Sequence, residues 1–144
     1  MDFIFSLPLL PIHVFSVTLT LLLVIIADAH GALWLFGKMH TLPQKRMSYL
    51  HTAIWIGLII TIIAGALMFS TYPAYLLSLT AFRLKILFIV MLVVNAIFIG
   101  KHMRLAQEQP FSSLSKNEKL ILIVSGIIST TGWIGAYTAA KFLG

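Results

Sequence analysis

Residues 82–103 read FRLKILFIVMLVVNAIFIGKHM. This stretch has about 20 mostly apolar residues, the length an α-helix needs to cross the hydrocarbon core of a bilayer. Its charged side chains occur only near the two ends. In the whole chain, 60% of the 144 residues are hydrophobic and 10% are charged. This composition is far outside the range of soluble domains and predicts an integral membrane protein.

Apolar segments of similar length occur on both sides of this stretch. Together they predict four membrane-spanning helices, near residues 12–36, 47–68, 82–103 and 120–143. Pro11 and Pro43 precede the first two spans, where proline is compatible with a helix start. Ser115 and Glu118 have the spacing of a capping box before the fourth. We therefore predict an all-α transmembrane four-helix bundle with up-down-up-down topology, with residues 1–144 as a single domain.

Basic residues are distributed unevenly between the two ends of the predicted bundle. Most lie in or beside the connections after the first and third spans, whereas Arg83, Lys85 and Lys141 lie at the other end. Because Lys and Arg favour the cytoplasmic side, segments 37–46 and 104–119 are expected in the cytoplasm and both termini in the periplasm. The expected location is the inner membrane of a prokaryote. This orientation accounts for the net charge of +6, so we expect no nucleic-acid partner.

Three of the five histidines are expected at similar depth, near the cytoplasmic side. His30 lies nearly two turns before the end of the first span, His51 near the start of the second, and His102 at the end of the third. His13 belongs to the opposite side, and His40 lies in a connection. An imidazole in lipid surroundings needs a partner, so His30, His51 and His102 predict a shared functional site.

The first interpretation of this site is a b-type haem held between helices, for which two neutral imidazoles are suitable axial ligands. We expect His51 and His102 to be the ligands, with His30 as the alternative. The protein would then serve electron transfer or redox chemistry, with a quinone or a porphyrin-like molecule as its partner. The chain has no cysteine and only four acidic residues, which leaves no thiolate and too few carboxylates for paired acid–base catalysis.

Two other interpretations remain open. A copper or zinc site built from the same histidines with Met39 or Met103 is weaker, because no His-x-x-x-His or Met-rich repeat accompanies it. Alternatively, each histidine only hydrogen-bonds water, headgroups or carbonyls. The protein would then be an accessory or anchor subunit of a larger membrane complex, or a small transporter. Small residues on the second and fourth spans would allow a homo-oligomer or a partner helix to pack closely.

Two further polar residues lie inside the predicted spans. A charged carboxylate is costly at the depth of Asp28, so we expect it to pair with His30 or with a histidine or water on another helix. Asn95 lies seven residues before His102 and therefore on nearly the same helical face. Either residue could serve a proton path or an interhelical hydrogen bond, and the hydrogen bond is the expected role of Asn95.

Short motifs in this chain resemble the copper resistance protein D (CopD) and HemJ-type membrane proteins. The motifs are His30-x-x-x-Trp34, the segment of residues 46–65 with Arg46, Gly57 and Gly65, and Phe82-Arg83-Leu84-Lys85 ahead of Asn95. The likeness covers about residues 20–105. It implies a small helical bundle that binds b-type haem, as in the HemJ-type protoporphyrinogen oxidases. His30 would match the early histidine of that family and Lys85 its later lysine.

One departure from that family lies after the first predicted span. There the family has a Pro-Arg pair, whereas this chain reads Gly37-Lys38-Met39-His40. The resemblance therefore points to haem binding rather than to protoporphyrinogen as the substrate.

Overall fold

The computed structural model describes residues 8–143, which form helices and no strands. The long helices are α2 (Leu9–Leu35), α3 (Gln44–Phe69), α5 (Thr80–Glu108) and α6 (Lys116–Lys141). All four are long and apolar enough to cross a membrane. The predicted all-α four-helix bundle is confirmed, and the chain is a multi-pass membrane protein.

The helices begin two to four residues earlier than the apolar runs predict, and α5 continues to Glu108. Apolarity marks only the part of a helix inside hydrocarbon, whereas the helix itself continues into the interface. The predicted capping box is present at the start of α6. The Glu118 amide donates to the Ser115 hydroxyl at 3.3 Å, and the Ser115 amide donates to the Glu118 carboxylate at 2.8 Å.

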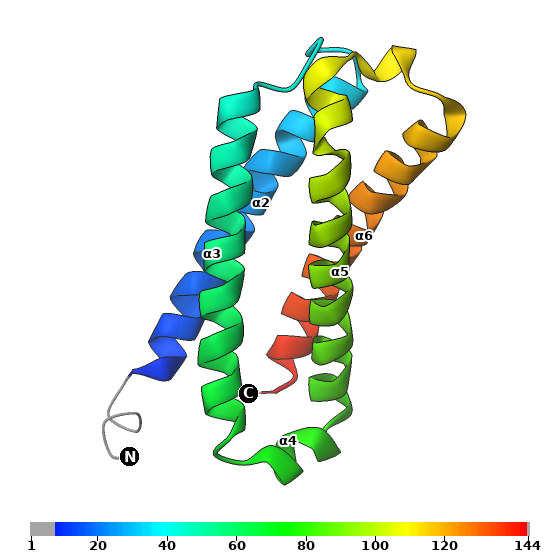
Figure 1. Cartoon of the computed structure of the whole chain (residues 1–144). Coiled ribbons are helices and arrows are strands. Elements are labelled where there is room, and N and C mark those ends of the chain that lie inside the picture. Colours follow the sequence, from blue (N-terminus) through cyan, green and yellow to red (C-terminus); the bar gives the residue numbers. More distant parts are fainter. Residues whose placement is uncertain (1–7, 144) are drawn as a thin grey trace.

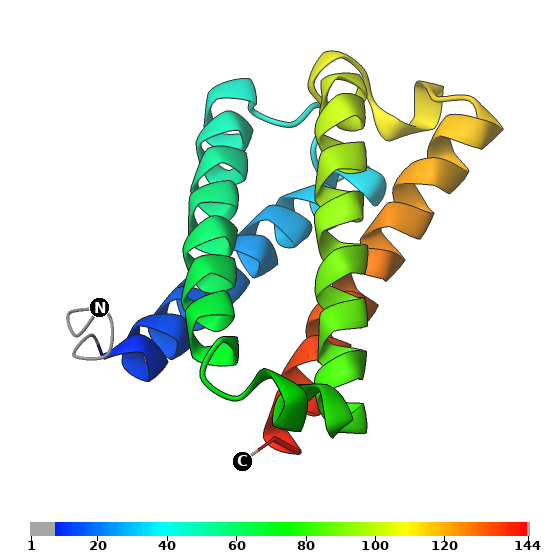
Figure 2. The same cartoon turned by 60° about the horizontal axis from the view of Figure 1, so that its bottom comes forward.

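The long helices form two antiparallel hairpins (Figure 1). α2 packs along α3, and α5 packs along α6, while contacts between the two hairpins are sparse. The same two pairs are visible in Figure 2 after rotation. The short helix α4 (Pro73–Ser78), which the sequence analysis did not predict, connects the two hairpins. α2 begins and α6 ends at the α4 end of the bundle, as the up-down-up-down prediction requires.

Aromatic contacts join the two hairpins at both ends of the bundle. Near the 3-10 helix η1 (Phe111–Ser113), the buried Trp34 ring packs edge-to-face on Phe111, with ring centroids 5.3 Å apart. The Trp34 indole also donates to the Gln109 carbonyl at 3.1 Å. At the α4 end, Phe69 of α3 stacks on Phe82 of α5 at 5.5 Å. These contacts hold the two hairpins together at both ends of the bundle.

Much of the outer surface is apolar, including the exposed side chains of Phe15, Leu22 and Ile63. In water such a continuous apolar surface would drive association. In a bilayer it faces acyl chains, which is the environment that the four apolar helices require.

Candidate functional site

His30, His51 and His102 do not converge on one site. Among residues 8–143, no three His, Cys, Asp or Glu side chains lie close enough together to hold a metal ion. Each histidine instead has a local hydrogen-bond partner. Similar depth in the bilayer therefore does not bring these side chains together, because they leave their helices in different directions.

The His51 ring lies between its own helix and α5. Its Nε2 accepts a hydrogen bond from the Trp55 indole, one turn later on α3, at 3.1 Å. On the other side, a Cβ added to Gly100 of α5 would lie 3.1 Å from the same Nε2. The lone pair of this nitrogen is therefore already engaged by Trp55.

His102, the expected partner of His51, hydrogen-bonds within its own helix. Its Nδ1 donates to the Phe98 carbonyl at 2.9 Å, and its ring lies over the Phe98 ring with centroids 4.4 Å apart. Position 102 lies about 200° around α5 from Gly100, the residue that contacts His51. The two imidazoles therefore lie on different sides of α5.

His30 and Asp28 also face different neighbours. The His30 Nδ1 donates to the Ile26 carbonyl at 2.7 Å, and its Nε2 accepts from the Arg46 guanidinium of α3 at 3.3 Å. The Asp28 carboxylate accepts from the Ser129 hydroxyl of α6 at 3.4 Å. The expected pairing of Asp28 with a histidine is not what the structure shows. Two residues correspond to about 200° around a helix, so Asp28 and His30 cannot face the same partner.

The expected interhelical hydrogen bond of Asn95 is confirmed. Its side-chain amide donates to the Ser125 carbonyl of α6 at 3.1 Å, and its carbonyl oxygen accepts from the Ser125 hydroxyl at 2.8 Å. Both residues are buried. This double hydrogen bond holds α5 against α6.

The sequence interpretation missed a buried polar cluster between α2 and α3. It consists of His13, Ser16, Thr20 and Thr61. The His13 Nδ1 lies 3.0 Å from the Thr61 carbonyl oxygen, which can only accept, so this nitrogen carries the proton. The Thr61 hydroxyl donates to the Ser16 hydroxyl at 2.9 Å. The spacing of positions 13, 16 and 20 on one helical face could have indicated the cluster.

Glycines of α3 allow α2 to approach this cluster closely. A Cβ at Gly65 would lie 3.2 Å from the His13 Cε1 atom, and a Cβ at Gly57 would clash with the Thr20 hydroxyl. The small residues Gly57 and Gly65 of the second span therefore let α2 and α3 pack closely within the hairpin, and they bring the His13 ring against the α3 backbone.

Lys85 of α5 lies at the same end of the bundle as His13 of α2, near α4. At this end Phe69 of α3 stacks on Phe82 of α5. Lys85 follows Phe82 by about one turn, and Gly65, which contacts the His13 ring, precedes Phe69 by about one turn. Lys85 and His13 therefore lie on the sides of the two hairpins that face each other, whereas His30 lies toward the other end of α2.

This pair of residues involves no carboxylate from the described part of the chain. Asp28 bonds to Ser129, and Glu108 forms a salt bridge with Arg104. Glu118 caps α6. Lys85 and His13 therefore form a nitrogen-rich site within the apolar bundle.

The hydrogen bond of His13 prepares its ring as a ligand. Histidines that bind metals usually donate their other ring N–H to a carbonyl or carboxylate, which sets the tautomer and the ring orientation. The Thr61 carbonyl has this role for His13 and leaves Nε2 with a lone pair. A lysine amine in its neutral form is a second nitrogen donor. His13 and Lys85 thus present two donor atoms from different hairpins.

No protein-family model, curated protein or solved structure matches this chain.

Proposed function

We propose that this protein binds a b-type haem between its two helical hairpins and serves electron transfer or redox chemistry in the membrane. The observation that carries the proposal is the buried His13 ring, whose Nδ1 donates to the Thr61 carbonyl and whose Cε1 lies against Gly65 of α3. Lys85 follows Phe82 by about one turn on α5, and Phe82 stacks on Phe69, about one turn after Gly65. Nitrogen donors on two different hairpins are suited to hold one haem between them. His13 and Lys85 are the residues that would bind its iron.

The surroundings of the pair fit a flat, apolar macrocycle. Few contacts join the two hairpins, so a planar group could lie between them without breaking an extensive core. The Thr61 carbonyl fixes the tautomer and the orientation of the His13 ring. When bound, haem would supply one-electron chemistry, while this chain would supply ligands, an apolar surrounding and orientation. A quinone or a porphyrin-like molecule is the proposed electron partner.

The family resemblance supports the same arrangement with one change. It implied a histidine from an early helix and a lysine from the start of a later one. Lys85 keeps that role, and His13 takes the place of His30 because it lies at the same end of the bundle as Lys85. The rival pair of His51 and His102 is less suitable, since the His51 Nε2 is engaged by Trp55.

The test is the visible absorption spectrum of detergent-purified protein from haem-sufficient cells, before and after dithionite. We expect a Soret band that shifts on reduction and a sharp reduced α-band. His13→Ala and Lys85→Ala should each abolish or strongly alter these bands. Lys85→Arg separates ligation from charge, because arginine keeps the positive charge but does not deprotonate to a neutral donor. We expect it to behave like Lys85→Ala.

Matched controls are His51→Ala, His102→Ala and Lys101→Ala, which should keep the wild-type spectrum. Circular dichroism and gel filtration would confirm that each variant is folded. Loss of the bands in the His51 and His102 variants, with retention in the His13 and Lys85 variants, would assign the haem to the rival pair. A colourless wild-type protein would refute haem binding and favour an accessory or anchor subunit.

A further inference from the structure

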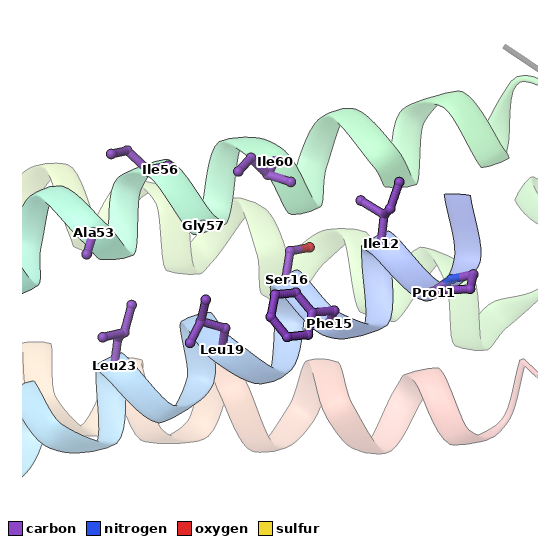
Figure 3. Close-up of a pocket in the computed structure, with 10 residues that line it drawn as sticks. All are labelled: Pro11, Ile12, Phe15, Ser16, Leu19, Leu23, Ala53, Ile56, Gly57 and Ile60. Atoms are coloured by element: carbon purple, nitrogen blue, oxygen red, sulfur yellow. The ribbon is translucent and has the colours of Figure 1, made fainter. Parts of the chain in front are cut away.

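A long apolar groove follows the outer face of the α2–α3 hairpin, away from the Lys85 side. It consists of two hollows of about 500 and 650 Å³ that share Leu23 and Ala53. Figure 3 shows Leu19 and Leu23 of α2 beside Ala53 and Gly57 of α3 in the first hollow. The small side chains of α3 at these positions leave the space open.

The chemistry of the groove changes along its length. The first hollow is lined almost entirely by apolar side chains, whereas the second contains Lys45, Arg46 and Tyr49. Along α3, the apolar part from Leu50 to Ile60 rises about 15 Å, at about 1.5 Å per residue. This is half of the roughly 30 Å hydrocarbon core, the depth of the acyl chains in one leaflet. The cationic end therefore lies at the level of the lipid headgroups.

The positive charge at this end is not neutralised by the described protein residues. Asp28, Glu108 and Glu118, the acidic residues among positions 8–143, have partners elsewhere. Arg46 instead donates to the neutral His30 Nε2 at 3.3 Å, which holds the guanidinium beside the groove. Two cations at one end of an apolar groove are complementary to a lipid that has an anionic headgroup and a hydrocarbon chain.

We propose that this groove is a binding site for one acidic phospholipid. Lys45 and Arg46 bind its phosphate, and one acyl chain lies along Leu23, Ala53 and Ile60. A second copy of the chain in the same membrane orientation would bring its own cations to the same level on this face, which charge repulsion disfavours. The acidic lipid is therefore favoured as the occupant. This site is independent of the proposed haem.

The test uses the full-length protein in nanodiscs of phosphatidylcholine. Each sample contains a small amount of one spin-labelled probe lipid, either phosphatidylglycerol or phosphatidylcholine, with the label on one acyl chain. The electron paramagnetic resonance spectrum measures the fraction of label immobilised by the protein. We expect the association constant of phosphatidylglycerol to exceed that of phosphatidylcholine by on the order of tenfold at low salt. The double variant Lys45→Gln/Arg46→Gln should lose this preference, and excess inorganic phosphate should not displace the labelled lipid.

The matched control Lys38→Gln/Lys101→Gln removes two positive charges from the same end of the bundle but outside the groove. It should keep the preference, and an equal loss in both double variants would show a general surface potential and overturn the site. Ala53→Trp fills the groove and leaves both cations, so it should lower the immobilised fraction of either lipid. Unchanged immobilisation in Ala53→Trp would also overturn the proposal.

Mass photometry of the same samples tests for a protein occupant. A wild-type dimer that Ala53→Trp converts to a monomer, without any lipid preference, would identify the groove as an interface between copies. Circular dichroism confirms the fold of each variant. The groove variants should not change the haem spectrum. A negative result in the lipid test therefore leaves the proposed haem binding untouched, and a negative result in the haem test leaves the lipid site untouched.

Discussion

The Nδ1 atom of His13 lies 3.0 Å from the carbonyl oxygen of Thr61, although 48 positions separate the two residues. The Nδ1 atoms of His30 and His102, in contrast, bond to carbonyls one turn earlier in their own helices. His13 is thus oriented by a neighbouring helix. Its position depends on how closely α2 approaches α3, and two glycines control that distance.

Gly65→Ala tests the proposal that His13 is a haem ligand. The added Cβ would lie 3.2 Å from the His13 ring, whereas the Cβ of Gly100→Ala would lie 3.1 Å from the His51 ring. The two substitutions are closely matched in size and crowding. If His13 is the ligand, Gly65→Ala should shift the reduced α-band or lower the haem content, and Gly100→Ala should not. The reverse result would support His51.

Gly57→Ala should destabilise the α2–α3 hairpin, because its Cβ would clash with the Thr20 hydroxyl, which is fully buried. We expect a loss of about 1–3 kcal/mol, the usual cost of overpacking. The measurement is reversible unfolding in mixed micelles. Gly126→Ala is the control, since nothing lies within 4 Å of its Cβ position. Equal destabilisation by both substitutions would contradict close packing at Gly57.

Asn95→Leu should weaken the α5–α6 hairpin, because it removes both hydrogen bonds to Ser125. Interhelical hydrogen bonds in membranes contribute about 0.6 kcal/mol on average and up to about 1.7. We therefore expect a loss of about 1–3 kcal/mol and a smaller loss for Ser125→Ala. In a double-mutant cycle the two effects should be clearly non-additive. Strict additivity would show that the two side chains do not interact.

Trp34→Ala should lower stability by about 3–5 kcal/mol, because it opens a cavity in the buried cluster near η1. Trp34→Phe keeps most of the apolar contact and loses the hydrogen bond to Gln109, so we expect about 1 kcal/mol. Phe36→Ala is the control, since this ring is 74% exposed. Thermal unfolding in detergent should rank the variants in this order. A large effect of Phe36→Ala would indicate a contact with another chain or with lipid.

Ser115→Ala should cost about 1 kcal/mol, because it removes the hydroxyl that caps α6. Ser112→Ala should change stability by less than about 0.5 kcal/mol, because Ser112 contributes its backbone carbonyl to Lys119. Chemical denaturation followed by circular dichroism would measure both. Similar values for the two variants would argue against the capping role.

Much of the fold was predictable from the sequence because it depends on local properties. Apolar runs of sufficient length predicted α2, α3, α5 and α6, and the spacing of Ser115 and Glu118 predicted the start of α6. Exact ends were not predictable, since helices continue into the interface, where apolarity no longer marks them. The short α4 was not predicted, because it has only six residues and lies between two of the apolar runs.

The candidate site was less predictable. The depth of a residue in the bilayer follows from its position along an apolar run, and on that basis His30, His51 and His102 were grouped and His13 was set aside. Whether side chains meet depends also on the rotation of each helix. Asn95 was correctly expected to bond between helices, because a buried amide in an apolar span must find a partner.

By itself, the sequence determined that this chain is a membrane protein and how many times it can cross the bilayer. Only the tertiary structure decided that the His13 ring is held by Thr61 of α3 and that Asp28 faces Ser129 of α6. The reason is that helix formation and membrane insertion depend on local hydrophobicity. The rotation and approach of helices depend instead on contacts between residues distant in sequence, such as Gly65 with His13 and Phe69 with Phe82.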